Sequence, residues 1–135
     1  MEVRVDLSRI LIQDTSDQQI IFLRERDGSR EFPIVIGDPE AVAIDRRLKG
    51  IKKVRPMTHD LMADLIERLG AQLDKIVIHD LKEHTFYAKL VIRHRGEVIE
   101  VDSRPSDAIA LGVASETPIY VSEHVLREAL RPSGS

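Results

Sequence analysis

The chain has 135 residues, no cysteine and a formal net charge of −3. That length suits one domain, and the lack of cysteine excludes a disulfide framework, a thiolate metal site and a cysteine nucleophile. The near-balanced charge gives no sign of the strongly positive surface with which many proteins hold nucleic acid.

The first part of the chain predicts three strands followed by a helix. The strands are expected at residues 3–13, 20–26 and 31–36. The helix is expected in GDPEAVAIDRRLKG, where Asp38 is a suitable N-cap, Pro39 fits the first helical position and Gly50 ends the helix. The basic residues that follow, 46–55, are interpreted as a solvated helix end and loop.

A connecting helix is expected at residues 57–70. Pro56 breaks the chain before it, Thr58 is the expected cap, and Gly70 is the expected end. The apolar residues of this helix predict one apolar face, made of Leu61, Met62, Leu65, Ile66 and Leu69.

The last part of the chain predicts three more strands, a buried helix, a short strand and a final helix. The strands are expected at residues 73–81, 85–94, 98–102 and 118–121. The buried helix is RPSDAIALGVA, which is rich in Ala and Leu. Ser122 caps the final helix, and residues 132–135 are expected to be a disordered tail.

Two segments recur along the chain in the same order. LSRILIQD at 7–14 matches LDKIVIHD at 73–80, and EAVAI at 40–44 matches DAIAL at 107–111 with nearly the same offset. Chance likeness of β-branched runs is the alternative. The matches predict an α+β domain over residues 1–131, built by tandem duplication of a β-β-β-α unit. The copies are expected at about 3–50 and 71–115, with the strand and helix of 118–130 after them.

The stretch VDSRPSD gathers polar groups where a strand turns into a helix. Arg104 offers a planar fork for phosphate or carboxylate, and ligand sites often collect at such turns. Carboxylates at Glu40, Asp102 and Asp107 suit a hard divalent cation. The alternative is an internal ion pair, in which Arg104 binds Asp102 or Glu40 and fixes the two repeats together.

His59 is the histidine with the most suggestive surroundings. It stands in RPMTHD, in the first turn of the connecting helix, and a helix N-terminus favours a neutral imidazole and binds anions. A cap at Thr58 and a first-turn acid at Asp60 are the purely structural explanation of the same motif.

Four motifs in this order and spacing resemble the bifunctional nuclease domain family of bacteria and plants. The motifs are FPIVIGDPEAVAI, RPMTHDLM, TFYAKL and VDSRPSDAIAL. The resemblance covers nearly the whole chain, from about Val3 to Leu130. It implies an α+β fold, oligomeric assembly, and cleavage of both RNA and DNA, an activity described mainly for plant members.

The roles of the residues at the matching positions are hypotheses drawn from their side-chain chemistry. Metal-assisted phosphodiester hydrolysis with Mg²⁺ or Mn²⁺ is the expected chemistry. The expected catalytic residues are His59, Asp60 and Asp107. The expected substrate-binding residues are Arg55, Thr58, Arg104 and Ser106. The expected metal ligands are Glu40, Asp102 and Asp107.

Two hypotheses of function therefore stand beside each other. One is a nonspecific nuclease, in which these residues share one open cleft. The other is a noncatalytic oligomeric module that binds a protein or a small ligand, in which the same charges neutralise one another. Neither a signal peptide nor a membrane span is expected, and the absence of cysteine fits the cytoplasm. A homo-oligomer is expected, with a dimer favoured.

Overall fold

The computed structural model describes residues 1–51 and 53–132 of the chain. It has the expected α+β fold, with strands in one seven-stranded sheet and helices packed against it. The strands are β1 (Glu2–Leu11), β2 (Gln18–Glu25), β3 (Glu31–Gly37), β4 (Gln72–Lys82), β5 (Thr85–His94), β6 (Glu97–Ser103) and β7 (Ile119–Ser122). The helices are α1 (Asp38–Leu48), α2 (Thr58–Arg68), α3 (Pro105–Gly112), the short 3₁₀ helix η1 (Val113–Ser115) and α4 (Glu123–Ala129).

The strand order in the sheet is β3-β2-β1-β7-β4-β5-β6. Strands β1 to β3 are antiparallel neighbours, and so are β4 to β6. Between them lies β7, which runs antiparallel to β1 and parallel to β4. Each half thus has three consecutive strands and then a helix, as the repeats predict, while the duplication itself stays a prediction.

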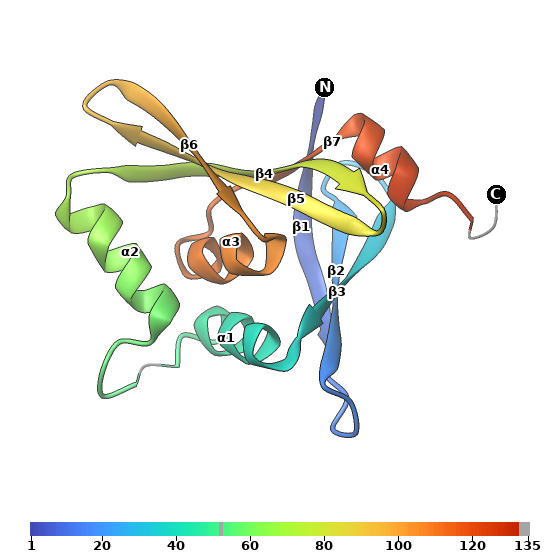
Figure 1. Cartoon of the computed structure of the whole chain (residues 1–135), viewed down its shortest axis with the longest axis horizontal. Helices are drawn as coiled ribbons and strands as arrows, with labels where there is room; N and C mark the ends of the chain where they lie inside the picture. Colours follow the sequence, from blue (N-terminus) through green and yellow to red (C-terminus); the bar gives the residue numbers. More distant parts are fainter. Residues whose placement is uncertain (52, 133–135) are drawn as a thin grey trace.

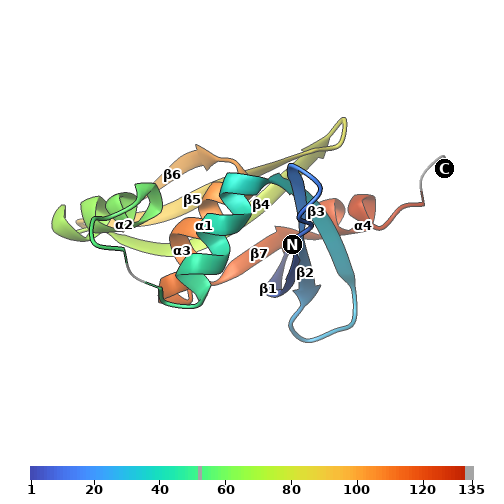
Figure 2. The ribbon, with the colours of Figure 1, turned by 90° about the horizontal axis from the view of Figure 1, so that it is seen from below.

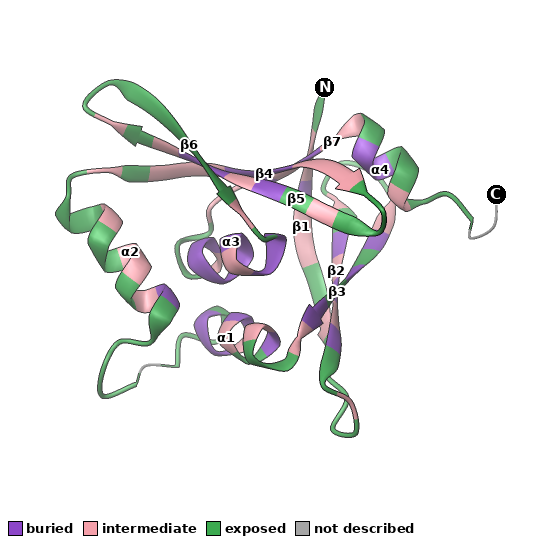
Figure 3. Ribbon diagram, viewed as in Figure 1, coloured by how far each residue is buried: buried purple, intermediate pink, exposed green. Residues whose placement is uncertain are grey.

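The sheet is strongly bent, and α1 and α3 lie side by side against it (Figures 1 and 2). Small side chains let these helices approach the sheet and each other closely. Ala41 and Ile44 of α1 and Ala108 to Leu111 of α3 are buried in one core with residues of six strands. Figure 3 shows that α3 is buried along most of its length. The core therefore anchors α1 from Ala41 onward and α3 along most of its length.

Two helices begin one residue away from the expected position. Gly37 and Met57 occupy the N-cap positions of α1 and α2, so Asp38 and Thr58 are the first helical residues. The side chains of two first-turn acids explain the difference. Asp38 accepts a hydrogen bond from the Gln19 side chain, and Asp60 accepts one from the backbone N–H of Met57. The expected helix ends at glycine are confirmed, since Gly50 and Gly70 both have positive φ.

The apolar residues of α2 divide between two faces. Met62, Ala63 and Ile66 pack against the core. Leu61, Leu65 and Leu69, here called the leucine row, are 52%, 52% and 69% exposed. The single apolar face expected from the sequence is thus only half used for packing within the chain.

Some sequence-based expectations fall outside what the structure describes. Residues 133–135 of the expected tail lie outside the described residues, and so does Lys52 of the basic stretch. In the described residues, none of the helices is both long and apolar enough to cross a membrane.

Candidate functional site

Four side chains from three helices meet where α1, α2 and α3 begin. They are Glu40 of α1, His59 of α2, Asp107 of α3 and Arg104, the N-cap residue of α3, here called the Arg104 cluster. Glu40 and Asp107 are each the third residue of their helix, so the same local structure presents both carboxylates. The cluster therefore joins the two halves of the chain.

The Asp107 carboxylate contacts His59 with one oxygen and Arg104 with the other. Its Oδ1 lies 3.0 Å from His59 Nε2, and its Oδ2 lies 2.8 Å from Arg104 Nη2. An ionised carboxylate only accepts hydrogen bonds, so His59 carries a hydrogen on Nε2. Neutral His59 then has its basic lone pair on Nδ1. This is the pairing by which a carboxylate orients a histidine base.

Arg104 lies between the two carboxylates of the cluster. Its Nη1 is 3.1 Å from Glu40 Oε1, and its Nη2 is held by Asp107. The hydrogen bonds that Arg104 donates to Asp107 and, second, to Glu40 raise the pKa of Arg104 above its ordinary value. The Arg104 side chain is nevertheless 65% exposed, so its remaining surface faces solvent.

The Glu40 carboxylate occupies the space that a side chain at position 37 would fill. A Cβ atom at Gly37 would collide with Glu40 Oε2. That oxygen is buried and has no hydrogen-bond partner among the described residues. The backbone before α1 therefore sets the position of Glu40, and one acceptor of the cluster is left unused.

A cavity of about 620 Å³ opens onto the Arg104 cluster. All four cluster residues line it, together with the cationic side chains of Arg46 and Lys53. Its apolar wall is made of Val42, Ala43, Ile51 and Met57. A cavity of this size with convergent polar groups and an apolar wall is typical of a small-ligand site. Arg104 therefore makes ion pairs, as the structural alternative predicts, but a cavity still reaches it.

Asp60 faces away from this cavity, although it follows His59. It binds the guanidinium groups of Arg46 and Arg47, and it accepts the Met57 N–H. Burial raises the pKa of Asp60, but these three hydrogen bonds outweigh burial and hold the pKa below its ordinary value. Asp60 thus fixes the start of α2, and with it the position of His59.

Arg46 and Arg47 are buried, which corrects the interpretation of this stretch as a solvated helix end. Arg47 donates to the backbone oxygens of Ala110 and Leu111 and so satisfies carbonyls in the last turn of α3. The sequence carried a weak signal for this, because Arg47 follows Ile44 by three residues on the buried face of α1. Lys53 is a further cation that sequence reasoning did not assign to the site.

The structure places the other expected site residues in different surroundings. Thr58 lines the cavity of the Arg104 cluster. Ser106 is buried and lines a neighbouring cavity instead. Arg55 lies exposed in the bend before α2, and Asp102 lies exposed on the edge strand β6. Neither Arg55 nor Asp102 is part of the lining of the cavity.

The described residues do not fit a divalent cation in this arrangement. They contain no group of three or more His, Asp or Glu side chains disposed to hold a metal ion. Asp102 is apart from Glu40 and Asp107, and between those two lies the guanidinium of Arg104. The Mg²⁺ or Mn²⁺ requirement stays an expectation, and the chemistry below is derived from the side chains alone.

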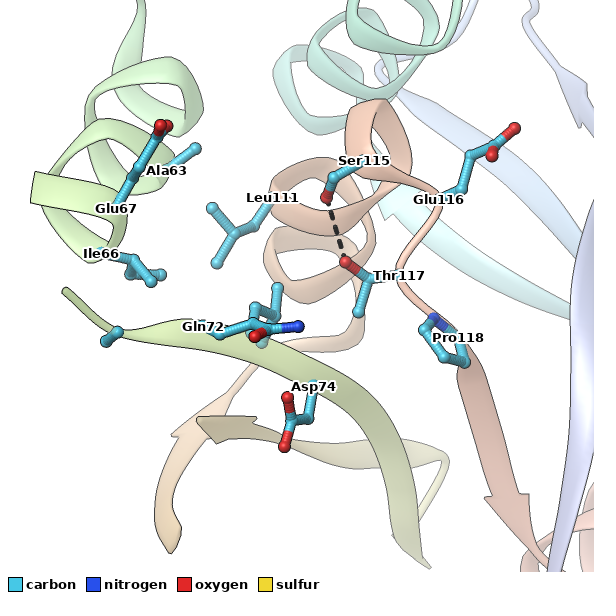
Figure 4. Close-up of a pocket in the computed structure, with 12 residues that line it drawn as sticks. Ala63, Ile66, Glu67, Gln72, Asp74, Leu111, Ser115, Glu116, Thr117 and Pro118 are labelled. Carbon is cyan, nitrogen blue, oxygen red and sulfur yellow. Dashed lines mark hydrogen bonds between the residues drawn. The ribbon is translucent and has the colours of Figure 1, made fainter. Parts of the chain in front are cut away.

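A second cavity, of about 370 Å³, lies between α2, β4 and the segment before β7 (Figure 4). Its charged side chains are the carboxylates of Glu67, Asp74 and Glu116, and its lining contains no Lys, Arg or His. Such a lining repels a polyanion. It offers neither a base nor a phosphate-binding cation, so the Arg104 cluster is the better candidate site.

Comparison with known proteins gives a match over most of the chain. The model of a family described as the bifunctional nuclease domain matches residues 21–133. An uncharacterized protein of Mycobacterium tuberculosis (strain ATCC 25618 / H37Rv) is 44% identical over 128 residues, which are 95% of this chain and 75% of that protein.

More distant relatives come from plants. Bifunctional nuclease 1 of Oryza sativa subsp. japonica is 25% identical over 118 residues, which are 84% of this chain and 36% of the plant protein. Bifunctional nuclease 2 of the same plant is 28% identical over 114 residues, which are 82% of this chain and 35% of that protein. The chain thus spans about a third of each plant relative.

Proposed function

The chain belongs to the bifunctional nuclease domain family, and from that premise we propose that it cleaves phosphodiester bonds of RNA and DNA. The proposed site is the cavity of the Arg104 cluster. One observation carries the proposal: a histidine oriented by a carboxylate lies beside an exposed guanidinium, and all three line a cavity of about 620 Å³.

His59 is the proposed general base. Its Nδ1 accepts the proton of a water molecule, or of a ribose 2′-hydroxyl in RNA, as that oxygen attacks phosphorus. The bond between phosphorus and the leaving oxygen breaks, and the leaving oxygen takes a proton from water. Asp107 keeps the hydrogen on His59 Nε2 and stabilises the imidazolium that forms.

Arg104 is the proposed phosphate-binding group. Its side chain is 65% exposed, and the cavity that it lines also contains Lys53 and Arg46 beside the carboxylate of Asp45. Donors that are already in place stabilise the charge that develops on the phosphate oxygens without reorganisation in the transition state. Thr58, at the start of α2, adds a hydroxyl to the same cavity.

A noncatalytic binding module is the second candidate. The observation that favours it is the pairing of Arg104 with both Glu40 and Asp107, which satisfies much of the charge of the cluster within the chain. In that case the same cavity would bind a ligand that remains unchanged.

A cleavage assay separates the two candidates. Purified protein is incubated with single-stranded RNA and duplex DNA, with Mg²⁺, with Mn²⁺ and with a chelator, beside His59→Gln prepared identically. Cleavage that His59→Gln lacks supports the nuclease. Equal cleavage by both proteins would place the activity elsewhere or in a contaminant, and no cleavage by either would leave the binding module. The metal conditions test the expected cation separately.

We also propose that the chain forms a homodimer through the leucine row of α2. Its three exposed leucines lie on one side of a helix, and apolar rows of this kind are common at interfaces between copies. Leu65→Glu should give a monomer in sedimentation, whereas an unchanged mass would refute the interface.

Cytoplasmic location remains the expectation from the absence of cysteine.

A further inference from the structure

Arg104 lines two cavities at once. It belongs to the cavity of the cluster and also to a neighbouring one of about 420 Å³, here called the β3 cavity. The β3 cavity is bounded by the edge strand β3, the turn between β4 and β5, and the start of α3. A ligand larger than the first cavity can therefore pass over Arg104 into the second.

The β3 cavity differs from the others in its charge. The cavity of the Arg104 cluster and the one between α2 and β4 both have carboxylates in their lining, whereas the β3 cavity has none, although the whole chain carries a net charge of −3. Its titratable side chains are Arg104 and His84. A polyanion that avoids the acidic surface elsewhere meets no repulsion from the lining of this cavity.

The remaining lining suits unpaired nucleobases. Pro33, Val35 and Phe86 supply apolar surface, and Phe86 also packs against Phe32 of the core with ring centroids 5.7 Å apart. Gln18 and Thr85 supply exposed hydrogen-bonding groups at the rim. Bases held in single strands present faces and edges to such surfaces, whereas a duplex keeps them inside its stack.

We propose that the β3 cavity is a second subsite for single-stranded nucleic acid, in which nucleotides adjoining the one at the Arg104 cluster bind. The inference rests on the proposed function, which places the nucleotide that is cleaved at the Arg104 cluster. It adds that the substrate is a single strand longer than a dinucleotide, and that residues of β3 and of the β4–β5 turn set this preference.

The test measures binding rather than cleavage. Fluorescence anisotropy gives the Kd of a labelled dinucleotide and of an oligonucleotide of about eight nucleotides, the scale of single-strand sites on small domains. Both probes are 2′-O-methylated, so that the 2′-hydroxyl attack cannot occur. The longer probe should bind at least about tenfold more tightly. An unlabelled duplex of the same length should compete poorly.

Val35→Glu places a carboxylate in the β3 cavity. Val35 is 59% exposed on an edge strand, so the variant should fold. It should weaken binding of the longer probe by about fivefold or more through repulsion and leave the dinucleotide unchanged. Val98→Glu is the matched control: Val98 is 65% exposed on the other edge strand, outside both cavities. It should change neither Kd.

A second variant removes a candidate contact without adding charge. His84 has φ +67°, a conformation that Asn also tolerates, so His84→Asn preserves the turn. It should weaken binding of the longer probe alone. Equal Kd values for both probes, equal competition by duplex, or equal effects of Val35→Glu and Val98→Glu would each overturn the subsite. Length-dependent binding without any cleavage would instead retain the subsite and refute the nuclease.

Discussion

His59 Nε2 lies 3.0 Å from Asp107 Oδ1, and this contact joins the first turn of α2 to the first turn of α3. Neither helix alone carries both the base and the carboxylate that orients it. Helix α3 is fixed by the core, and α2 is fixed by the ion pairs of Asp60. The candidate base is therefore held by two rigid elements.

The first prediction concerns Asp107→Asn. The amide has nearly the same shape, but it no longer stabilises an imidazolium or fixes the hydrogen on Nε2. Cleavage should fall by about 10² to 10⁴-fold, the usual contribution of an oriented general base. Rates on single-stranded RNA measure the loss, and circular dichroism checks the fold.

Asp102→Asn is the matched control for this exchange. Asp102 stands only five positions away in the sequence, but it lies exposed on β6 and outside the lining of the cavity. Its variant should cleave at the wild-type rate. A loss as large as that of Asp107→Asn would instead support the carboxylate set that the sequence suggested.

The second prediction concerns Gly37→Ala. The backbone of Gly37 is extended, so alanine fits its conformation, but the new Cβ displaces the carboxylate of Glu40. The fold should survive, because only the end of a flexible side chain has to move. Cleavage should fall about as far as in Glu40→Ala, because both changes remove the carboxylate that holds Arg104 Nη1 in place.

A double-mutant cycle tests this explanation of Gly37→Ala. If the alanine acts only through Glu40, adding it to Glu40→Ala should cost nothing further. Additive losses in the double variant would show that Gly37 affects the site by another route.

The paired positions of Glu40 and Asp107 could be predicted from the sequence. Both helices closely follow a strand, and both carboxylates stand at the third helical position, one or two residues after a proline. Helix starts depend on neighbouring residues, so this part of the site is encoded locally. The matching segments EAVAI and DAIAL indicated that the two starts are equivalent.

Asp102 shows where sequence reasoning stopped. Its strand, β6, is exposed at nearly every position, so no hydrophobic alternation indicates which face a given side chain occupies. Arg47 shows a different limit. Its partners Ala110 and Leu111 lie on another helix, and only the packing of α1 on α3 brings them within reach.

The third prediction concerns Arg47→Met, which tests the buried arginine. Methionine keeps most of the volume but removes the donors to Ala110 and Leu111 and one cation beside Asp60. The free energy of unfolding should fall by about 3 kcal/mol, since buried acceptors lose their partners. Urea denaturation measures it. A change below about 0.5 kcal/mol would contradict the structural role of Arg47.

The fourth prediction concerns stability in acid. Arg30, between β2 and β3, binds Glu123 of α4 through two hydrogen bonds of 2.8 and 2.9 Å. This pairing, ahead of all other influences, lowers the pKa of Glu123 from its ordinary 4.5 to about 2. The pairing with Arg30 also lowers the pKa of Glu25. Both carboxylates therefore bind protons more weakly in the folded chain than in the unfolded one.

The sign of the pH dependence follows from that difference. Between pH 4.5 and about 2 the unfolded chain binds more protons, so the stabilisation present above pH 4.5 is lost as the pH falls through this range. Glu123→Gln should be less stable at pH 7 and should lose less stability on acidification. Glu128→Gln, on the exposed side of the same helix, should keep the wild-type slope. Because Glu25 and Asp60 also have lowered pKa values, some slope should remain in Glu123→Gln, and an unchanged slope there would show that the Arg30 pairing does not stabilise the fold.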